Sequence, residues 1–248
     1  MSRTVVITQP MYLPWPGIYE QIRLADVLVY YDDVQLPRGK GFNTRVQIKN
    51  DSEQGWQWLS IPVQREDSRL QRIDQTKFVD QTWRKKHQRA IEQSYRKAPH
   101  FERVWSELID PILQLETDLL SELCIESMSR VARYLGLDRE FHRSSQLTDI
   151  ATEDPTERLI LICQRFGATD YVSGKGGMRY IAHDRFEAAS VKVSYMDYAL
   201  APYPQLHGSF NPYVSIIDLL FHTGPEAPTY LTTKARYWRD WPELSSQK

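Results

Sequence analysis

Residues 5–35 read VVITQPMYLPWPGIYEQIRLADVLVYYDDVQ, an order of strand, proline-rich turn, helix and strand. The short apolar runs at 5–7 and 27–31 are typical of strands that are buried on both faces of a parallel sheet. Between them, prolines at positions 10, 14 and 16 prevent a regular element, and apolar residues between 17 and 25 recur at helical spacing. The stretch therefore predicts a right-handed β-α-β crossover, the unit of an α/β fold.

Polar side chains gather at the two points where these strands end. Because the carboxyl ends of neighbouring parallel strands meet at the edge where α/β sheets bind ligands, we expect both groups to face one crevice. The first group is Gln9, Tyr12 and Trp15, and the second is Asp32, Asp33 and Gln35. Asp32 or Asp33 would act as a general base, bind a substrate amine or hold Mg²⁺, with an Asx-type turn as the structural alternative. Tyr12 and Trp15 would stack on a sugar or a base, unless they only cover the core.

The rest of the chain continues to alternate strands and helices. A β-hairpin is predicted over 45–63 and a short strand near 73, and a mostly helical section follows at about 81–136, with helices at 82–94, from 101 to about 110 and from 112 to 135. Further strands are predicted at 139–143, 170–173 and 191–196, helices at 155–166 (capped by Asp154) and 214–222, and a polar tail after them. We therefore predict one α/β domain over residues 1–248: a Rossmann-like, mainly parallel sheet with an inserted hairpin and a helical subdomain.

Charge and composition exclude several classes of partner. With 31 basic and 32 acidic residues the net charge is −1, so no global field favours DNA or a membrane. No apolar run approaches the ~18 residues of a membrane span, and the first residues lack a secretory signal. Two cysteines are too few for a disulfide framework or a CxxC metal site, and no set of ligands has zinc spacing. We expect a cytoplasmic protein without a structural metal.

Two basic segments are candidates for binding phosphate. Asn43 and Arg45, with Lys40, lie in one predicted loop. The guanidinium of Arg45 could bind a phosphate bidentately. The alternative is that the loop is only solvated. The helix at 82–94 carries a dense positive face that includes Lys86 and could take a pyrophosphate, a carrier protein or tRNA; its alternative is a plain solvated surface. His87 is the side chain there that can exchange a proton near neutral pH.

A glycine-rich loop and a second histidine complete the candidate site residues. Ser173, Gly174 and Lys175 follow a predicted strand, and glycine frees backbone N–H groups to point at an anion, so this loop is a candidate phosphate cradle. It is not a Walker A motif, since GxxxxGK[ST] is absent. His207 lies in a loop rich in proline and aromatic residues and is a candidate acid or base, although a lone loop histidine is usually at the surface.

Several motifs run in collinear order along nearly the whole chain. They are QP at 9–10, YLPW at 12–15, DDVQ at 32–35, WRKKH at 83–87, YRKAP at 95–99, YPQ at 203–205 and SIIDLLF at 215–221. In this order they resemble the WbqC-like protein family. The resemblance implies a setting in bacterial polysaccharide and O-antigen gene clusters, and with it the tailoring of nucleotide-activated amino sugars, for example by attachment of an amino acid. The chain departs from the usual family pattern at 42–46, 173–179 and 222–224.

The opening turn is also similar, more weakly, to that of nucleotidylyltransferase-like α/β enzymes, a group that includes pantothenate synthetase. Those enzymes carry an HxGH motif at this turn, whereas residues 13–17 here read LPWPG, without either histidine. This second resemblance implies ATP–Mg²⁺ as a cofactor, while the residues themselves require none.

The residues and the resemblance together predict an enzyme that forms an amide, by acyl or aminoacyl transfer to an amine of a nucleotide-activated amino sugar or related small metabolite. Asp32 or Asp33 would accept the amine proton, and residues 173–177 with the basic helix would hold phosphate. The donor would be an adenylate, a carrier-protein thioester or an aminoacyl-tRNA. A non-catalytic protein that binds a sugar nucleotide or a partner, and an ATP-dependent nucleotidylyltransferase-like ligase, are the alternatives. Convergence of the two aspartates with His87 or His207 on one pocket favours the enzyme, and aromatics without an acid/base pair favour the binding protein.

Overall fold

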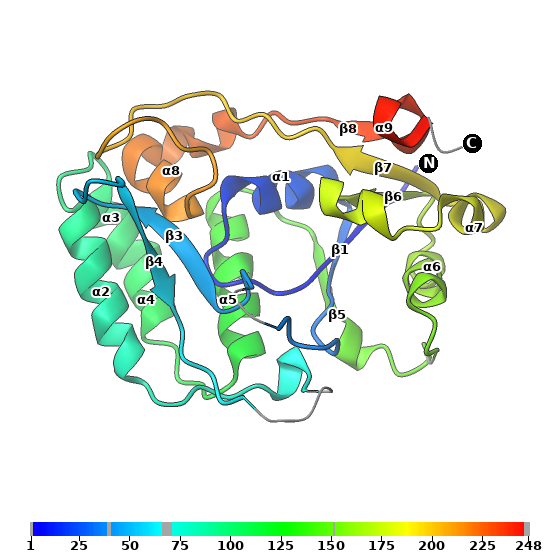
Figure 1. The fold of residues 1–248 in the computed structure, drawn as a ribbon, viewed down its shortest axis with the longest axis horizontal. Coiled ribbons are helices and arrows are strands. Elements are labelled where there is room, and N and C mark those ends of the chain that lie inside the picture. Colours follow the sequence, from blue (N-terminus) through cyan, green and yellow to red (C-terminus); the bar gives the residue numbers. More distant parts are fainter. Residues whose placement is uncertain (1, 39–40, 66–70, 151, 246–248) are drawn as a thin grey trace.

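The sheet at the centre of the molecule has an α/β, Rossmann-like arrangement in the computed structural model, which describes residues 2–38, 41–65, 71–150 and 152–245 (Figure 1). Its six strands lie in the order β5-β2-β1-β6-β7-β8. They are β1 (Thr4–Thr8), β2 (Val27–Tyr30), β5 (Glu140–Arg143), β6 (Asp170–Ser173), β7 (Lys192–Met196) and β8 (Ala235–Tyr237). All neighbours are parallel except β8, which is antiparallel to β7. The predicted fold class is confirmed.

The first crossover agrees with the prediction from residues 5–35. β1 and β2 pair in parallel, and α1 (Pro16–Leu24) connects them. Proline suits the first position of α1 because its fixed φ is helical and its missing N–H is not needed there. The strand order then reverses: the chain proceeds from β1 through β2 to β5, and α6 (Pro155–Arg165) carries it back to β6 on the other side of β1. The topological switch point of the sheet therefore lies between β1 and β6.

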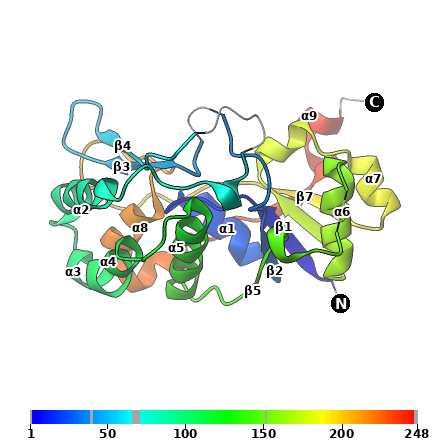
Figure 2. The same cartoon turned by 90° about the horizontal axis from the view of Figure 1, so that it is seen from below.

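Helices cover both faces of this sheet. α1 and α5 (Leu120–Tyr134) lie on one side of β1 and α6 on the other, with α7 (His183–Ala188) beyond it (Figure 2). Because successive side chains of a strand point to opposite faces, Val6 packs with α1 and α5 whereas Val5 packs with α6 and α7. Burial on both faces requires apolar residues at every position, which explains the continuous apolar runs of β1 and β2.

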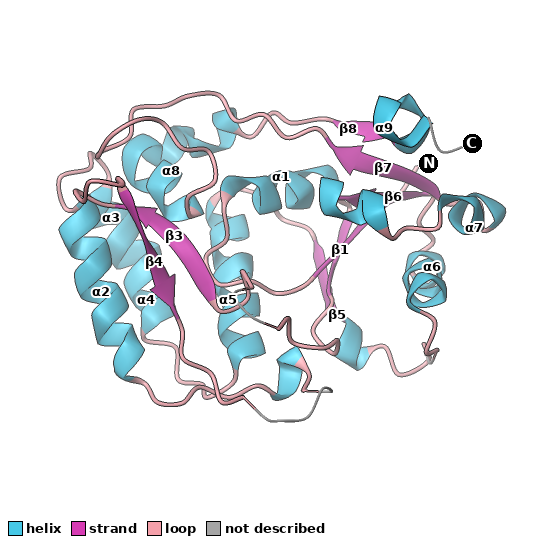
Figure 3. Cartoon of the chain, viewed as in Figure 1, coloured by secondary structure: helices cyan, strands magenta, loops and turns pink. Residues whose placement is uncertain are grey.

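The predicted hairpin and helical section lie together on the side of α5 away from the sheet (Figure 3). β3 (Arg45–Lys49) and β4 (Trp56–Ser60) form the antiparallel hairpin. The helices beside it are α2 (Thr82–Tyr95), α3 (Phe101–Val104), α4 (Asp110–Leu113) and α8 (Ile216–Thr223). Among the described residues, no helix has the length and apolar character needed to span a bilayer.

Several element boundaries differ from the prediction. Pro111 does not end the helix that starts at Phe101, because a π-helical turn, Trp105–Ile109, leads into α4 and the proline lies in the first turn of α4. Residues 114–119 separate α4 from α5, which therefore begins at Leu120 rather than 112. The predicted strand near 73 is a 3₁₀ turn, Ile73–Gln75. The segment predicted as a polar tail contains β8 and α9 (Pro242–Ser245). β8 is too short to show a period in the sequence, and its pairing with β7 stabilises it.

Candidate functional site

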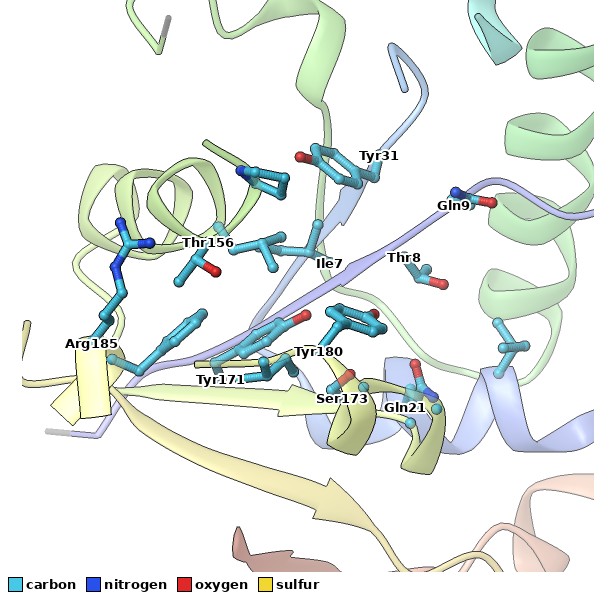
Figure 4. A pocket seen from close by; sticks show the side chains of 18 of the residues that line it. Ile7, Thr8, Gln9, Gln21, Tyr31, Thr156, Tyr171, Ser173, Tyr180 and Arg185 are labelled. Atoms are coloured by element: carbon cyan, nitrogen blue, oxygen red, sulfur yellow. The ribbon is translucent and has the colours of Figure 1, made fainter. Parts of the chain in front are cut away.

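A pocket of about 710 Å³ opens at the switch point between β1 and β6 (Figure 4). Its walls come from β1 and β6, from the residues that follow β1, β2 and β6, from the 3₁₀ helix η4 (Lys175–Arg179), and from α1, α6 and α7. This is where open α/β sheets bind their ligands. The sequence placed the crevice between the ends of β1 and β2. The pocket lies on the other side of β1 because the strand order reverses there.

Aromatic rings form much of the apolar wall. Tyr171 and Phe186 stack with their centroids 5.4 Å apart. Tyr31 lies across the pocket from Tyr171 and Tyr180 (Figure 4), and Tyr180 is 67% exposed, so its ring stands at the mouth. These rings offer flat surfaces against which a planar or ring-shaped ligand can pack.

The uncharged polar side chains of the wall are those of Thr8, Gln9, Gln21, Thr156 and Ser173. Gln21 projects from the buried side of α1 and is only 7% exposed. Its amide lines the pocket and has no hydrogen-bond partner among the residues that the structure describes. The amide is accessible from the pocket, so a ligand that enters can form hydrogen bonds to it in place of water.

Close packing favours glycine at some positions of the loop after β6, most clearly at Gly177. A Cβ atom at Gly174 would lie 2.9 Å from Nε2 of Gln21, and one at Gly177 would lie 2.6 Å from Oγ of Ser173. Lys175, the charged residue of this loop, does not line the pocket; its ammonium lies 3.1 Å from a carboxylate oxygen of Asp197. Packing therefore accounts for Gly177 but not for Gly176, where a Cβ atom would meet nothing within 4 Å, and the role of the loop as a phosphate cradle stays a prediction.

The two charged residues that line the pocket neutralise each other. Asp154 Oδ1 accepts a hydrogen bond of 2.8 Å from the backbone N–H of Glu157, and Arg185 Nη1 lies 2.9 Å from Asp154 Oδ2. The backbone N–H and then the guanidinium lower the pKa of Asp154. Within the described ranges no group of three or more His, Cys, Asp or Glu is arranged to hold a metal ion. The pocket thus presents hydrogen-bonding groups without a free charge.

The predicted carboxylates lie outside this pocket and already have partners. Asp32 is buried, and its carboxylate accepts hydrogen bonds from the backbone N–H and hydroxyl of Ser145, at 3.0 and 2.8 Å. Asp33 forms an ion pair with Arg158 of α6 and accepts a hydrogen bond from Ser144. The two side chains tie the end of β2 to the turn after β5 and to α6. Their catalytic role stays a prediction, without support from this geometry.

Tyr12 and His87 belong to the core, which corrects two expectations. Tyr12 is fully buried, and its hydroxyl lies 3.2 Å from Nδ1 of His87. The other ring nitrogen of His87 lies 3.2 Å from the carbonyl oxygen of Ser60. Burial lowers the pKa of His87 to about 4. His87 is therefore neutral near pH 7 and cannot exchange a proton there as predicted, and Tyr12 does not face the ligand crevice.

The candidate phosphate clamp is divided between two structural contacts. Asn43 is buried and donates a hydrogen bond of 2.8 Å to the carbonyl oxygen of Pro10, which fastens the loop to the turn after β1. The guanidinium of Arg45 stacks on Trp58, 3.8 Å from the ring centroid. Lys40, the third member, lies outside the described residues. These contacts account for Asn43, whereas the buried Nε of Arg45 has no hydrogen-bond partner among the described residues.

The remaining predicted residues lie apart from one another. Trp15 packs edge-on against a tyrosine after β7, with centroids 4.6 Å apart, and Gln35 is exposed. Lys86 is exposed on α2, and His207 Nε2 lies 2.8 Å from the carbonyl oxygen of Ser94. The structure thus brings Gln9, Ser173 and Gly174 to the pocket. It does not bring Asp32, Asp33, His87 and His207 together there.

Sequence reasoning missed Gln21, Tyr31 and Tyr180. A signal for Gln21 exists, because a glutamine between Ile18 and Ile22 falls on the apolar side of the predicted helix. Tyr31 is the last residue of a predicted strand at the ligand edge. Tyr180 has no local signal.

The model of the WbqC-like protein family matches residues 9–230 of the chain. The chain belongs to this family. This WbqC-like protein is also 36% identical over 230 residues to the uncharacterized protein Rv1507c of Mycobacterium tuberculosis (strain ATCC 25618 / H37Rv). The aligned residues make up 92% of this chain and 97% of the relative. No solved structure matches the chain significantly. All residues that line the pocket except Ile7 and Thr8 lie within the family match.

Proposed function

We propose that this WbqC-like protein binds a nucleotide-activated sugar, or a related small metabolite, in the switch-point pocket. The observation that carries the proposal is the amide of Gln21, which faces the pocket and has no hydrogen-bond partner among the described residues. A ligand group that both donates and accepts a hydrogen bond would satisfy this amide. The volume of about 710 Å³ supports the proposal, because small-molecule sites usually measure about 300–1,000 Å³.

The lining indicates which part of the ligand lies in the pocket. The aromatic wall suits a ring, and the amides and hydroxyls suit uncharged polar substituents. The charges of Asp154 and Arg185 are already paired, so no side-chain cation of the lining is free for a phosphate. We therefore place the sugar or the base in the pocket, with the phosphates toward the solvent.

The test is a titration with UDP-N-acetylglucosamine and UDP-glucose, followed by isothermal calorimetry and by thermal unfolding. Ligand at about 100 times its dissociation constant should stabilise the protein by about 2.7 kcal/mol. Gln21→Leu, which keeps the size of the side chain, should weaken binding about tenfold or more because the ligand group loses its partner. The matched control is Gln93→Leu on the exposed side of α2.

Equal affinities of the wild type and Gln21→Leu would refute the assignment of the site. Absence of binding by both nucleotide sugars would refute the ligand class. Uridine, UDP and the free sugar, tested separately, identify which part of the ligand contacts Gln21.

Acyl or aminoacyl transfer to an amine of the same ligand is the second candidate function. The observation that favours it is the exposed face of α2, where Lys85, Lys86 and Arg89 form no ion pair with a described residue. α2 lies at the opposite end of the molecule from α6 and α7 (Figure 1), so this face suits an acidic carrier protein or tRNA rather than the phosphates of the pocket ligand. Mass spectrometry for an amide product, after incubation with an amino-sugar nucleotide and a thioester or aminoacyl-tRNA donor, separates transfer from binding alone.

A further inference from the structure

A second cavity, of about 760 Å³, lies between the hairpin turn at residues 50–55 and the loop at residues 207–213. It shares no lining residue with the switch-point pocket. In Figure 1 the long connection from β7 crosses the molecule to reach the hairpin before it returns to α8. The cavity therefore exists only because two segments far apart in sequence meet.

Buried polar contacts hold the long loop in place. Residues 197–215 contain no helix or strand, and irregular segments of this length are uncommon unless they are functional. The ammonium of Lys49 donates a hydrogen bond of 2.6 Å to the carbonyl oxygen of Ser209. The hydroxyl of Tyr203 donates one of 2.8 Å to Asp218, which is completely buried in α8. His207 contacts the carbonyl oxygen of Ser94 on α2. Together these three contacts hold the loop in place, so the cavity is formed without a ligand.

Aromatic rings line both sides of this cavity. Trp56 comes from β4, and Phe210 and Tyr213 come from the loop. Tyr213 is 59% exposed. The neighbouring Trp58 is different, because the guanidinium of Arg45 covers its ring. Trp56 and Tyr213 are thus the rings that can receive a ligand.

Charges of both signs line the cavity. Lys49 is only 3% exposed, and burial lowers the pKa of its ammonium. On the turn, Asp51 and Glu53 are exposed and form no ion pair with a described residue. Lys49 disfavours a cationic ligand, and the two carboxylates disfavour an anionic one. A neutral ligand with several hydroxyls can use both, since each hydroxyl donates one hydrogen bond and accepts others.

We propose that this second cavity binds a neutral saccharide ring. The apolar C–H face of the ring packs on Trp56 and Tyr213, and its hydroxyls donate to Asp51 and Glu53 and accept from Lys49. The proposal does not depend on the function assigned to the switch-point pocket.

The test uses free, uncharged sugars without nucleotide: glucose, galactose and N-acetylglucosamine. Binding is measured by saturation-transfer difference NMR and by titration of tryptophan fluorescence. Tyr213→Ala and Trp56→Ala should each weaken binding about tenfold, the usual consequence of losing one ring contact. Asp51→Asn should weaken it less. Asp138→Asn, at an exposed carboxylate outside both cavities, should leave it unchanged.

Three results would overturn the proposal. The first is the absence of a signal from all three sugars with the wild type. The second is binding that Tyr213→Ala leaves intact and Gln21→Leu abolishes, because the sugar would then lie in the switch-point pocket. The third is binding of choline or inorganic phosphate in this cavity when none of the three sugars binds there. Tyr213 is largely exposed, so its variant tests the site even if Trp56→Ala fails to fold.

Discussion

His87 illustrates how its surroundings decide the chemistry of a single side chain. The imidazole is 3% exposed and lies between the hydroxyl of Tyr12 and the carbonyl oxygen of Ser60. Burial removes the water that would stabilise its charged form, so its pKa falls from 6.5 to about 4. The hydrogen bond to Ser60 opposes this effect, and the positive charge of Arg84 adds to it. A histidine within a basic helix is here a neutral part of the core.

This burial predicts a loss of stability in mild acid. In the unfolded chain His87 takes up a proton near pH 6.5, whereas in the folded chain it does so only near pH 4, so the unfolded state binds more protons between these values. The free energy of unfolding should fall by about 2 kcal/mol between pH 7 and pH 5 through this residue alone. Urea denaturation at both pH values measures it.

In His87→Gln this part of the pH dependence should disappear. His142→Gln, which removes a partly exposed imidazole, is the control for losing a histidine. A pH dependence that is the same in the wild type and His87→Gln would show that the imidazole is protonated in the folded state.

At the scale of elements, the end of β2 is fastened to distant segments by its two aspartates. Asp32 receives hydrogen bonds from the turn after β5, and Asp33 pairs with Arg158 on α6. The side chains of Asp33 and Arg158 are only 11% and 18% exposed. A carboxylate that neutralises a half-buried guanidinium is not free to act as a base, so the pair predicts a structural role.

Asp33→Asn should therefore lower the free energy of unfolding by about 2 kcal/mol, because it leaves the half-buried charge of Arg158 unpaired. Arg158→Met should have a similar effect, and the double variant should lose less than the sum of the two. Chemical denaturation of the four proteins measures this coupling. The exposed pair of Asp149 and Arg165 supplies the control, since Asp149→Asn should cost less than about 1 kcal/mol. An Asp33→Asn variant as stable as the wild type would reopen the catalytic interpretation of Asp33.

At the scale of the whole molecule, two apolar cores lie back to back on one sheet. Val5 belongs to the core under α6 and α7, and Val6 belongs to the core under α1 and α5. Both residues are completely buried in the same strand. The two cores cannot be separated without breaking β1, so we expect them to unfold together.

Val5→Ala and Val6→Ala should each lower the stability by about 2 kcal/mol, from lost burial and a small cavity. Each variant should shift the whole transition, with coincident curves by far-ultraviolet circular dichroism and tryptophan fluorescence. Val79→Ala, at a side chain that is 56% exposed, should change the stability by less than about 0.5 kcal/mol. Two separate transitions in either core variant would contradict a single cooperative unit.

Local patterns were sufficient for much of the fold. Residues 5–35 predicted β1, α1 and β2 because a buried strand, a proline-braced turn and a helical period each leave a short-range pattern. Asp154 was predicted correctly as a helix cap because capping is a local contact: its carboxylate accepts a hydrogen bond from the backbone N–H of Glu157, three residues later in the chain. Gln9, Ser173 and Gly174 line the pocket because they lie at the ends of β1 and β6, and the carboxyl ends of parallel strands share one edge.

The tertiary structure alone decided the rest. Strand order depends on pairing between distant segments, so the sequence could not show that β6 returns beside β1 and moves the pocket to that side. Asp33 meets Arg158 across 125 positions of chain, and His87 is enclosed by residues from two other segments. Residue type and local spacing determine which elements form, whereas burial and long-range contacts determine which side chains keep a free charge or an unpaired hydrogen bond for a ligand.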